Sequence, residues 1–401
     1  MKALYITYDG LLDPLGQSQI LPYLRSINCN VSALHIISFE KSKNDILNIN
    51  KLQQEFKKSE ITWSYLKFTQ SKNSLLKVVD VFKFLFLFFK TCLRDKPDIV
   101  HARGHPMAIF SMPFKFFFHF KLLFDYRGVW ADERVVKGGW DLSKALDRYS
   151  YNFFRWVESL IVERSDHMIV LTKAVRDQLL VNTRQQSQNI TVIPCACDFT
   201  LFDIQECHLP NKQAASFKVL GYLGSIGPLY NFSFYLEVLL ECINQGINCK
   251  GLVVTNNISE ANHLINSMDS TIIKNNIDLI QASREEVPAL INQMDFLLSF
   301  ITTYKSTVGA CPTKIGEALA CGVPIISNQG IGDIDWIVKD LDAGIILSGY
   351  SKTDLIDAIN YISSDEKPNR RLIREKARKY FDLKVANASY QSAYSLIQER
   401  L

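Results

Sequence analysis

The chain has 401 residues and a mass of 45.8 kDa, and 47% of its residues are hydrophobic. That length exceeds what one hydrophobic core usually supports, so we expect two domains. The formal net charge is only +4, but residues 1–200 carry +8 and the remainder carries −4. We therefore expect the first half to face an anionic partner, such as phosphates, an acidic glycan or a membrane surface, and not a nucleic acid.

The nine cysteines are scattered without a C-x-x-C pair, and no secretory segment precedes them. This usage is typical of free thiols in a reducing compartment, so we expect a cytoplasmic protein. The group Cys195, Cys197, Cys207 and His208 matches no familiar zinc spacing. We expect no metal site there or elsewhere.

Short apolar runs alternate with helix-length segments from the first residues onward, which is the pattern of parallel βαβ units. Seven such runs come first, at residues 2–8, 32–39, 61–68, 98–102, 121–127, 167–171 and 190–194. After an irregular stretch, a second series follows at residues 217–224, 249–256, 277–282, 295–300, 323–328 and 343–347. We expect the domain boundary in that stretch, near residues 200–215.

The predicted architecture is α/β, with two doubly wound, Rossmann-like parallel sheets that face each other across a central cleft. We place the domains at residues 1–205 and 206–380. Residues 351–401 are expected to be helical throughout, and their last part, 381–401, to pack back on the first domain. Ligands of open parallel sheets bind beyond the carboxyl ends of the strands, so candidate site residues are sought in those loops.

The most apolar stretch, residues 75–93, contains Lys77, Asp80, Lys83 and Lys90 within one arc of a helix. It is therefore predicted to be an amphipathic helix rather than a membrane span. Two interpretations stay open: the helix packs on a sheet, or it and residues 110–121 lie on an anionic bilayer surface with their lysines toward the lipid.

The loop after the first strand contains Gly10 and Gly16 but lacks the G-x-G-x-x-G spacing of a dinucleotide site. A nicotinamide or flavin enzyme is therefore disfavoured. Glycine at these positions lets a ligand approach backbone N–H groups closely, which makes Gly16 a candidate binding residue.

Two later loops of the first domain carry the residues expected to act in chemistry. We place Arg103 and His105 in the loop after the fourth strand, where an arginine can hold an anion and a histidine can move a proton. Asp125 and Arg127 follow the next buried strand, and a carboxylate there is a candidate base toward a hydroxyl.

In the second domain, the first strand runs into a glycine turn that contains Gly224 and Ser225 and is followed by Tyr230. Exposed backbone N–H groups and a serine hydroxyl suit a phosphate, and Asn231 is predicted to cap the next helix. The same features also occur in ordinary α/β turns.

The stretch CPTKIGEALACGVPIISN, residues 311–328, reads as a helix followed by a buried strand. Cys311 and Pro312 mark its entrance, with Pro312 near the first helical position, and Gly322 marks its end. Pro312 and Thr313 are candidate donor-binding residues. A ligand over that entrance would meet free N–H groups, the ammonium groups of Lys305 and Lys314, and the carboxylate of Glu317. Phosphates suit the first two, and the vicinal hydroxyls of a ribose suit the third.

With these residues placed, the sequence resembles a family 4 glycosyltransferase of the GT-B fold over essentially its full length. PTKIGEALACGVPII, residues 312–326, is similar to the helix of that family that binds the donor, and VIPCACD, residues 192–198, is similar to its domain junction. YDGLLDPLGQSQILPYL and FDYRGVWADERV resemble a subgroup of bacterial enzymes that build surface polysaccharides.

The resemblance implies that Glu317 holds the ribose of a nucleotide sugar, without any cofactor or metal. Two departures stand out. Gly309 occupies the place of the family's first glutamate, and Ser225 and Tyr230 stand where an arginine and a lysine usually bind the diphosphate. The replacement charge must therefore come from Lys305, Lys314, Arg103 or Arg127.

The resemblance thus implies a retaining, metal-independent transfer of a hexosyl or N-acetylhexosaminyl group to an acceptor hydroxyl. The donor is expected to bind on the second domain. We expect it to be a UDP-sugar or, failing that, a GDP-sugar. The acceptor, a glycan or lipid-linked glycan of cell-surface polysaccharide synthesis, is expected on the first domain. The basic first domain and its segments rich in Phe and Lys predict that this acceptor is met at the inner face of the cytoplasmic membrane. Two alternatives remain: a catalytically silent binding subunit and a GT-B nucleotide-sugar 2-epimerase.

Overall fold

The computed structural model describes the chain except residues 42–45, 70–73, 206–216, 269 and 365–367. Cys207 and His208 therefore lie outside the described residues. The chain divides into two compact units, which are treated separately below. Unit 1 comprises Met1–Pro194 and Ala386–Leu401, and unit 2 comprises Cys195–Val385.

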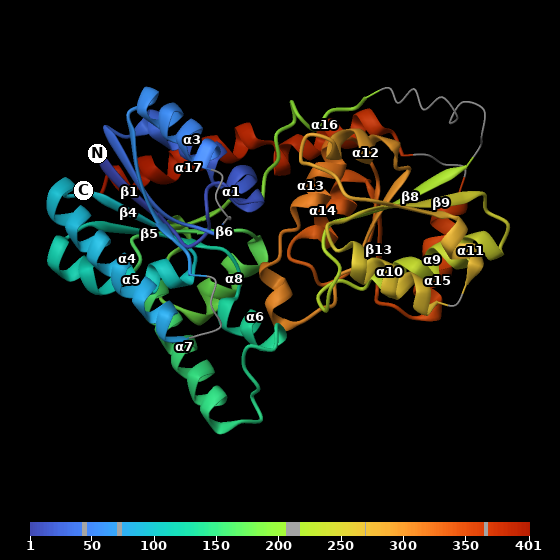
Figure 1. Cartoon of the computed structure of the whole chain (residues 1–401), viewed down its shortest axis with the longest axis horizontal. Helices are drawn as coiled ribbons and strands as arrows, with labels where there is room; N and C mark the ends of the chain where they lie inside the picture. The colour runs from blue at the N-terminus through green and yellow to red at the C-terminus, as the bar shows by residue number, and fades with distance from the viewer. Residues whose placement is uncertain (42–45, 70–73, 206–216, 269, 365–367) are drawn as a thin grey trace. The chain divides into compact units, whose positions relative to one another are not determined.

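Unit 1 is built on a sheet of seven parallel strands in the order β3-β2-β1-β4-β5-β6-β7 (Figure 1). Every strand coincides with one of the first seven predicted runs. The order reverses between β1 and β4, so the carboxyl ends of these strands form the edge where ligands are expected. The strands are β1 Lys2–Thr7, β2 Ala33–Glu40, β3 Ile61–Lys67, β4 Ile99–Arg103, β5 Lys121–Tyr126, β6 His167–Val170 and β7 Ile190–Val192.

Helices cover both faces of this sheet, with α4, α5 and α7 on one side and α3 and α17 on the other (Figure 1). Parallel strands need such crossover connections, and a sheet covered on both faces explains why its strands are apolar almost without interruption. The helices of this part are α1 Pro14–Gln19, α2 Leu21–Ile27, η1 Asn28–Asn30, α3 Ile46–Lys58, α4 Ser74–Asp95, α5 His105–Phe118, α6 Trp130–Val136, α7 Ala145–Arg164, α8 Lys173–Asn182 and η2 Ser187–Asn189.

Unit 2 repeats the plan with six parallel strands in the order β10-β9-β8-β11-β12-β13. They are β8 Lys218–Leu223, β9 Cys249–Val254, β10 Ile277–Ile280, β11 Phe296–Ser299, β12 Ile325–Asn328 and β13 Gly344–Leu347. Their helices are α9 Phe232–Asn244, α10 Ile258–Ser267, α11 Thr271–Asn275, α12 Val287–Gln293, η3 Lys305–Gly309, α13 Thr313–Ala320, α14 Ile334–Leu341, α15 Lys352–Ser363 and α16 Arg370–Phe381. The two sheets confirm the predicted α/β class.

The core of unit 2 lies on both faces of its sheet, because successive side chains of a strand point to opposite faces. In β8, Val219 and Leu223 belong to one buried cluster, and Leu220 and Tyr222 belong to the other. The two layers of helices therefore rest on a strand without an exposed face. This packing fixes the end of β8, where the next turn begins.

The compact units divide after Pro194, earlier than the expected boundary after residue 205. The segment that begins at Cys195 is bound to the rest of unit 2. The Cys197 N–H donates to the Phe381 carbonyl at 2.9 Å, and the Leu383 N–H donates to the Cys197 carbonyl at 3.0 Å. Such pairing between distant segments leaves no mark in local sequence patterns.

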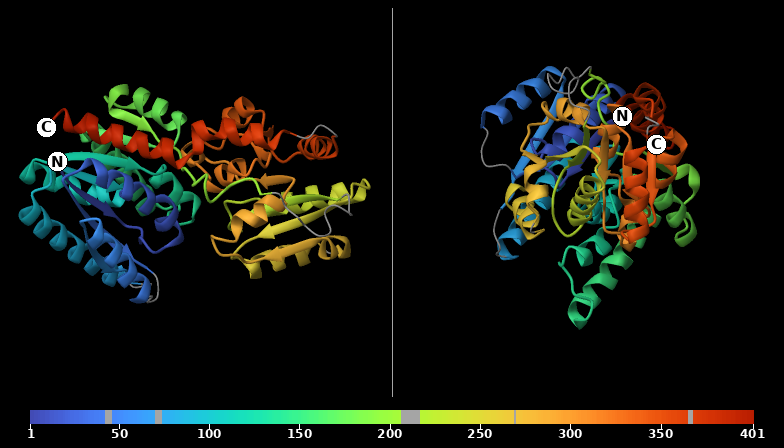
Figure 2. Two further views of the ribbon diagram at one scale, coloured as in Figure 1. Left: turned by 90° about the horizontal axis from the view of Figure 1, so that it is seen from above. Right: turned by 90° about the vertical axis from the view of Figure 1, so that its right-hand side faces the viewer.

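The C-terminal segment forms three helices, α15, α16 and α17 (Leu383–Gln398), rather than the continuous helical stretch expected. In Figure 2, α17 is the red helix that runs to the C-terminus. From Ala386 onward the chain belongs to unit 1, so the predicted return of the last helix is confirmed. There the Tyr394 hydroxyl contacts the His101 Nδ1 at 2.9 Å, and the Gln391 amide donates to the Ser26 hydroxyl at 3.0 Å.

The amphipathic helix predicted at residues 75–93 is confirmed as α4. Its polar face differs from the prediction in one respect, because Asp80 is buried while Lys77, Lys83 and Lys90 are exposed. The Asp80 carboxylate accepts hydrogen bonds from the backbone N–H and hydroxyl of Thr69, at 2.9 and 3.0 Å, which explains its burial. Among the described residues, no helix is both long and apolar enough to cross a bilayer.

Gly322 ends α13 as predicted, and we expect it to be irreplaceable there. Its φ is +70°, and a Cβ atom would lie 2.3 Å from the Arg370 carbonyl oxygen. Gly322→Ala should therefore lower the free energy of unfolding by at least about 2 kcal/mol, measured by urea denaturation. Gly246→Ala is the matched control, because Gly246 has φ +80° but open space around its Cβ. An equal loss in both variants would contradict the steric explanation.

Candidate active site

The entrance of α13 holds a buried lysine without a carboxylate partner. Lys314 is 8% exposed, and no acidic group of the described part of unit 2 pairs with its ammonium. Its Nζ lies 4.2 Å from the ring centroid of Tyr230 and 5.3 Å from that of Tyr222. Burial lowers the pKa of Lys314 to about 7. Two aromatic rings thus lie beside an ammonium group that no carboxylate in the described part of unit 2 neutralises.

Glu317 lies one turn further along the same helix and is also buried. Its Oε1 lies 3.3 Å from the Arg284 Nη1. Burial raises the pKa of Glu317, and the Arg284 guanidinium opposes that shift only in part. Arg284 lies beyond the carboxyl end of β10, and sequence analysis did not single it out. The loop after β10 therefore contributes to this site together with α13.

The glycine turn after β8 lies against Lys314. Gly224 has φ +113°, a conformation that favours glycine, and a Cβ atom there would lie 3.7 Å from the Lys314 Nζ, so the turn lies directly beside the ammonium. Ser225 is exposed, and its carbonyl accepts a hydrogen bond from the Tyr222 hydroxyl at 2.7 Å. The structure thus brings Gly224, Tyr230 and Lys314 together. Asn231 caps α9 as predicted, through a bond from the Phe234 N–H at 3.1 Å.

The remaining predicted residues of unit 2 surround the start of α13. Pro312 is the N-cap and Thr313 is the first helical residue, so the predicted entrance is confirmed to within one position. Lys305 is exposed at the start of η3, and Gly309 ends that short helix. Of the two lysines proposed to supply positive charge, only Lys314 is buried beside the glycine turn.

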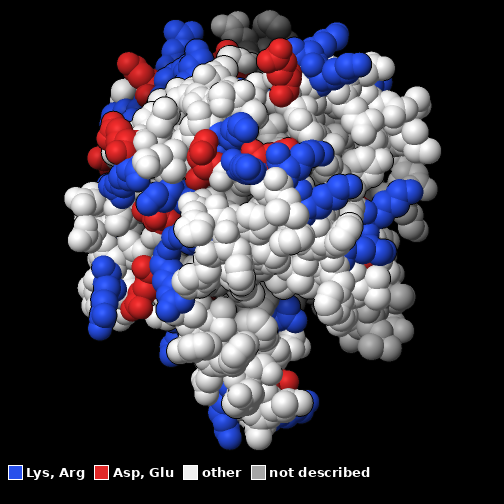
Figure 3. All heavy atoms as spheres, turned by 90° about the vertical axis from the view of Figure 1, so that its left-hand side faces the viewer, with Lys and Arg blue, Asp and Glu red and all other residues white. Residues whose placement is uncertain are grey.

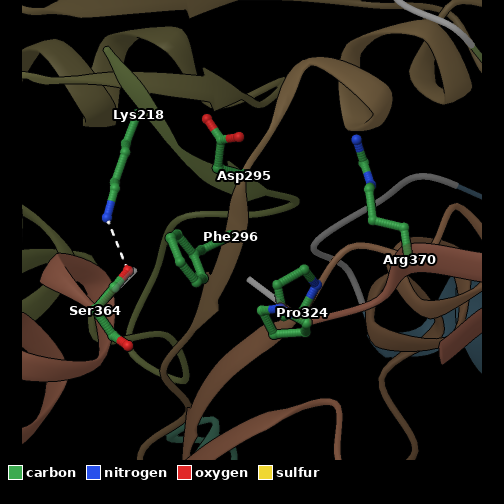
Figure 4. A pocket seen from close by; sticks show the side chains of 7 residues that line it. Lys218, Asp295, Phe296, Pro324, Ser364 and Arg370 are labelled. Atoms are coloured by element: carbon green, nitrogen blue, oxygen red, sulfur yellow. Dashed lines mark hydrogen bonds between the residues drawn. The ribbon is translucent and has the colours of Figure 1, made fainter. Parts of the chain in front are cut away.

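Two cavities of unit 2 differ in their relation to this cluster. A hollow of about 810 Å³ borders the turn after β8, and Tyr230, Asn231 and Thr302 are among its lining residues. The cavity in Figure 4 is only about 90 Å³ and lies at the opposite edge of the sheet, where β8 and β11 begin. There Lys218 donates to the carbonyls of Ile362 and Ser364. Ligand pockets are larger, so we interpret the second cavity as structural.

In unit 1, the residues expected to act in chemistry converge on Asp125. The parallel register places Arg103 beside Asp125, and their side chains lie 3.3 Å apart. The Arg127 Nε lies 2.8 Å from the Asp125 carboxylate, the His101 Nε2 lies 3.5 Å away, and the Tyr390 hydroxyl donates to it at 3.5 Å. Burial opposes ionisation, but Arg127, His101 and Arg103 hold the pKa of Asp125 well below its usual range.

The placement of two residues in this cluster differs from the prediction. Arg103 and His105 were placed in a loop, but Arg103 ends β4 and His105 begins α5, because Gly104 alone makes the turn with φ +79°. Asp125 is fully buried and contacts Arg103 and Arg127, so it holds both in place, and its role as a base stays a prediction.

His105 is buried in a second group beside the Asp125 cluster. Its Nε2 lies 3.4 Å from the Glu158 carboxylate, and its ring stacks against Trp130. Glu158 also accepts a hydrogen bond from the Tyr126 hydroxyl at 2.8 Å and pairs with Arg155 at 2.9 Å. Burial opposes ionisation here too, but His105 and Arg155 lower the pKa of Glu158.

Gly16 lies in α1, where its backbone packs against the preceding loop. A Cβ atom there would lie 2.0 Å from the Gly10 carbonyl oxygen, so the loop itself requires glycine. The buried Glu40 accepts hydrogen bonds from the Leu11 and Leu12 N–H groups at 2.9 and 3.3 Å. Glu40 therefore holds this loop, and its place at the end of β2 was not noticed in the sequence.

Among the described residues, no three His, Cys, Asp or Glu side chains are arranged to hold a metal ion.

Two family models match the chain. Residues 64–201 match Glycosyltransferase Family 4, and residues 207–380 match Glycosyl transferases group 1. Together the two matches cover most of the chain. The chain therefore belongs to the family 4 glycosyltransferases, which confirms the resemblance inferred from its motifs.

Solved structures of the same fold align over nearly the whole chain. A glycosyltransferase from Rickettsia africae has a TM-score of 0.70 at 14% identity, over 100% of this chain and 99% of its own. HepE from Anabaena, in complex with UDP and glucose, has a TM-score of 0.68 at 15% identity, over 99% of this chain and 99% of its own. WaaG, a glycosyltransferase involved in lipopolysaccharide biosynthesis, has a TM-score of 0.65 at 13% identity, over 98% of this chain and 99% of its own. These likenesses establish the GT-B fold. No curated protein matches the chain in sequence.

Proposed function

We propose that this glycosyltransferase moves a sugar from a nucleoside diphosphate sugar to an acceptor hydroxyl, with retention of the anomeric configuration and without a divalent metal. One observation carries the proposal. Lys314 is a buried, unneutralised cation at the entrance of α13, one turn before the buried carboxylate of Glu317. A diphosphate joined to a ribose supplies the negative charge that Lys314 lacks as a partner, and its ribose supplies paired hydroxyls that can donate to the Glu317 carboxylate beside the contact with Arg284.

The reaction builds negative charge on the leaving diphosphate while the sugar becomes oxocarbenium-like. Lys314 and the first N–H groups of α13 would stabilise that charge, which gives the chain its own substitute for a metal ion. In a front-face retaining reaction, the leaving phosphate oxygen takes the acceptor proton. The absence of a glutamate at Gly309 is therefore compatible with turnover.

The donor is a UDP-sugar in the first instance and a GDP-sugar in the second, carrying a hexosyl or N-acetylhexosaminyl group. The HepE structures with UDP, and with UDP-glucose, support this order by analogy of fold. A silent binding subunit is less well supported, because such a subunit would not need an unneutralised lysine beneath a glycine turn.

The acceptor is a glycan or lipid-linked glycan of cell-surface polysaccharide synthesis, handled at the inner face of the cytoplasmic membrane. In unit 1, Arg103 and Arg127 are the groups proposed to hold an anionic part of the substrates, and Asp125 is proposed to position both. His105, oriented by Glu158, is proposed to move a proton beside them.

We expect Glu317→Ala to weaken donor binding by about 30-fold, roughly 2 kcal/mol, because two hydroxyls lose a charged acceptor. Calorimetry with the nucleotide sugar measures the Kd. Glu285→Ala serves as the control, because Glu285 is exposed next to Arg284. A Kd within about twofold of the wild type, roughly 0.4 kcal/mol, would show that Glu317 does not hold the ribose.

A thermal-shift screen against UDP-, GDP-, ADP- and CDP-sugars in the presence of EDTA tests the proposed function. We expect the sugars of one nucleotide to raise the melting temperature of the protein, with or without the chelator. The stabilising sugar is then incubated with the protein alone and followed by NMR. Conversion to an epimer without an acceptor would identify the 2-epimerase alternative, and stabilisation by no nucleotide sugar would favour the silent subunit.

A further inference from the structure

The exposed aromatic side chains of the described residues are concentrated on three helices. Among the exposed large hydrophobic residues, nine are aromatic, and eight of these lie on α4, α5 and α7. The ninth is Tyr304, in unit 2. The eight are Phe82, Phe86, Phe89, Phe116, Phe117, Tyr149, Phe153 and Trp156. Exposed aromatic groups in such a concentration mark an interaction surface.

The three helices are neighbours on one face of the first sheet. α5 contacts both α4 and α7, and all three lie on the same side of the strands in Figure 1. Figure 3, which views the side where α4 and α5 lie, shows a broad surface without charged side chains, bordered by lysine and arginine with some acidic side chains among them. The outer surface of these helices is called the α4–α5–α7 face below.

The charge of the α4–α5–α7 face is strongly positive. Within the bounds of the three helices, Glu163 is the one exposed acidic side chain in the part of the chain that the structure describes. The two other acids nearest the lysines of α4 are engaged, Asp80 with Thr69 and Asp95 with Arg94 and His35. Six basic side chains are exposed on these helices, and two of them have acidic neighbours, Arg94 paired with Asp95 and Lys83 at 3.9 Å from Asp80. The six are Lys77, Lys83, Lys90, Arg94, Arg148 and Arg164, so the face keeps a net positive charge.

A basic cavity opens between the end of α5 and the end of α7. Its volume is about 420 Å³, and Phe116 lines it together with three cations. The Lys115 and Lys121 ammonium groups lie 2.5 and 3.3 Å from the Asp166 carboxylate, and the Arg164 guanidinium lies 5.5 Å from the Phe116 ring. One carboxylate cannot neutralise three cations, so the cavity carries excess positive charge.

We propose that the α4–α5–α7 face docks on an anionic phospholipid bilayer and that the cavity beside Phe116 takes a lipid phosphate. The exposed aromatic rings would lie at the boundary between headgroups and acyl chains, with the basic side chains toward the phosphates. The proposal rests on the proposed function, since it gives the enzyme access to a lipid-linked acceptor. Charge complementarity selects the lipid surface over a neutral apolar partner.

Co-sedimentation of the full chain with vesicles tests the proposal. We expect strong binding at low salt to vesicles of phosphatidylcholine mixed with phosphatidylglycerol, and weak binding to phosphatidylcholine alone. The double substitution Lys83→Gln/Lys90→Gln should weaken binding to the mixed vesicles by roughly 25-fold, about fivefold for each charge. Phe86→Ser/Phe117→Ser should weaken it by about tenfold or more. Equal recovery of the wild type with and without vesicles would overturn the proposal.

Helix α3 supplies matched controls, because it lies on the other face of the same sheet. Leu47 is 70% exposed, as is Phe86, and Lys57 and Lys58 are exposed basic residues. Leu47→Ser and Lys57→Gln/Lys58→Gln should leave vesicle binding within about twofold of the wild type. If these controls lose binding as strongly as the variants of α4 and α5, the attraction is non-specific and the docking face is wrong.

Arg164→Gln tests the cavity itself, since Arg164 is exposed and makes no ion pair with Asp166. We expect about fivefold weaker binding to mixed vesicles and no change with neutral ones. Donor affinity by calorimetry separates the two proposals: docking variants should keep it, and loss of donor binding without loss of vesicle binding would overturn only the proposed function. Self-association abolished by Phe86→Ser/Phe117→Ser, seen by light scattering without vesicles, would assign the face to a second copy instead.

Discussion

We expect Lys314→Met to weaken binding of the nucleotide-sugar donor by at least about 100-fold, roughly 3 kcal/mol, because it removes the buried charge that we propose to face the diphosphate. Methionine preserves most of the apolar stem that packs between Tyr222 and Tyr230. The folded structure should therefore persist, and the melting temperature at pH 7 or below should rise, since an unneutralised buried cation is removed. Calorimetry and a thermal melt measure the two effects.

The pH dependence of donor affinity gives a second readout for Lys314. Burial lowers its pKa to about 7, so the free protein holds a protonated amine below that pH and a neutral one above it. Donor affinity should therefore fall as pH rises through 7, by up to about tenfold per pH unit. The affinity of Lys314→Met should be independent of pH in this range. Lys339→Met, on an exposed lysine of α14, should behave like the wild type.

Lys314 also makes the free energy of unfolding depend on pH. The unfolded chain keeps this lysine protonated up to about pH 10.4, whereas the folded protein releases the proton near pH 7. The unfolded state thus binds more protons between these values, so the contribution of Lys314 to stability rises with pH across that window.

Equal donor affinity in Lys314→Met and the wild type would show that another group binds the diphosphate.

We expect Asp125→Asn to lower the free energy of unfolding by about 3–5 kcal/mol, because it removes the nearest counter-charge of the buried Arg103 and of the partly buried Arg127. Arg103 and Arg127 both contact this carboxylate, and Asp125 itself is fully buried. The pKa of Asp125 is depressed, so its contribution is present above the unfolded pKa near 4 and is lost as pH falls below it.

Urea denaturation at pH 7 measures this effect. Asp177→Asn is the control, because Asp177 is 62% exposed and forms only a surface pair with Arg176. That substitution should change the free energy of unfolding by less than about 1 kcal/mol. A similarly small change for Asp125→Asn would contradict its role as the centre of the buried cluster.

The fold could be predicted from the sequence because its signal is local. Each buried parallel strand is a short apolar run, and all thirteen strands coincide with predicted runs. The α13 helix could be predicted equally well, since Pro312 and Gly322 mark its two ends. Lys314 and Glu317 followed from their place on that helix.

The contacts that complete the sites are long-range, and local patterns do not contain them. Arg284 reaches Glu317 from another loop, and Tyr390 reaches Asp125 from the last helix, 265 residues away. The burial of Asp80 likewise depends on Thr69, which faces it from outside α4. Helical periodicity assigns a charged residue to an exposed face, whereas a specific hydrogen bond from elsewhere can draw it inward.

The central claim is that unit 2 binds a nucleoside diphosphate sugar through Lys314 and Glu317 without a metal. Calorimetric titration of the wild type with UDP-glucose in EDTA, beside Lys314→Met and Glu317→Ala, tests it most directly, with GDP-, ADP- and CDP-sugars titrated next. We predict saturable binding of one of these donors to the wild type in the chelator and a large loss of affinity in both variants. Binding that requires added metal, or that survives both substitutions unchanged, would contradict the account.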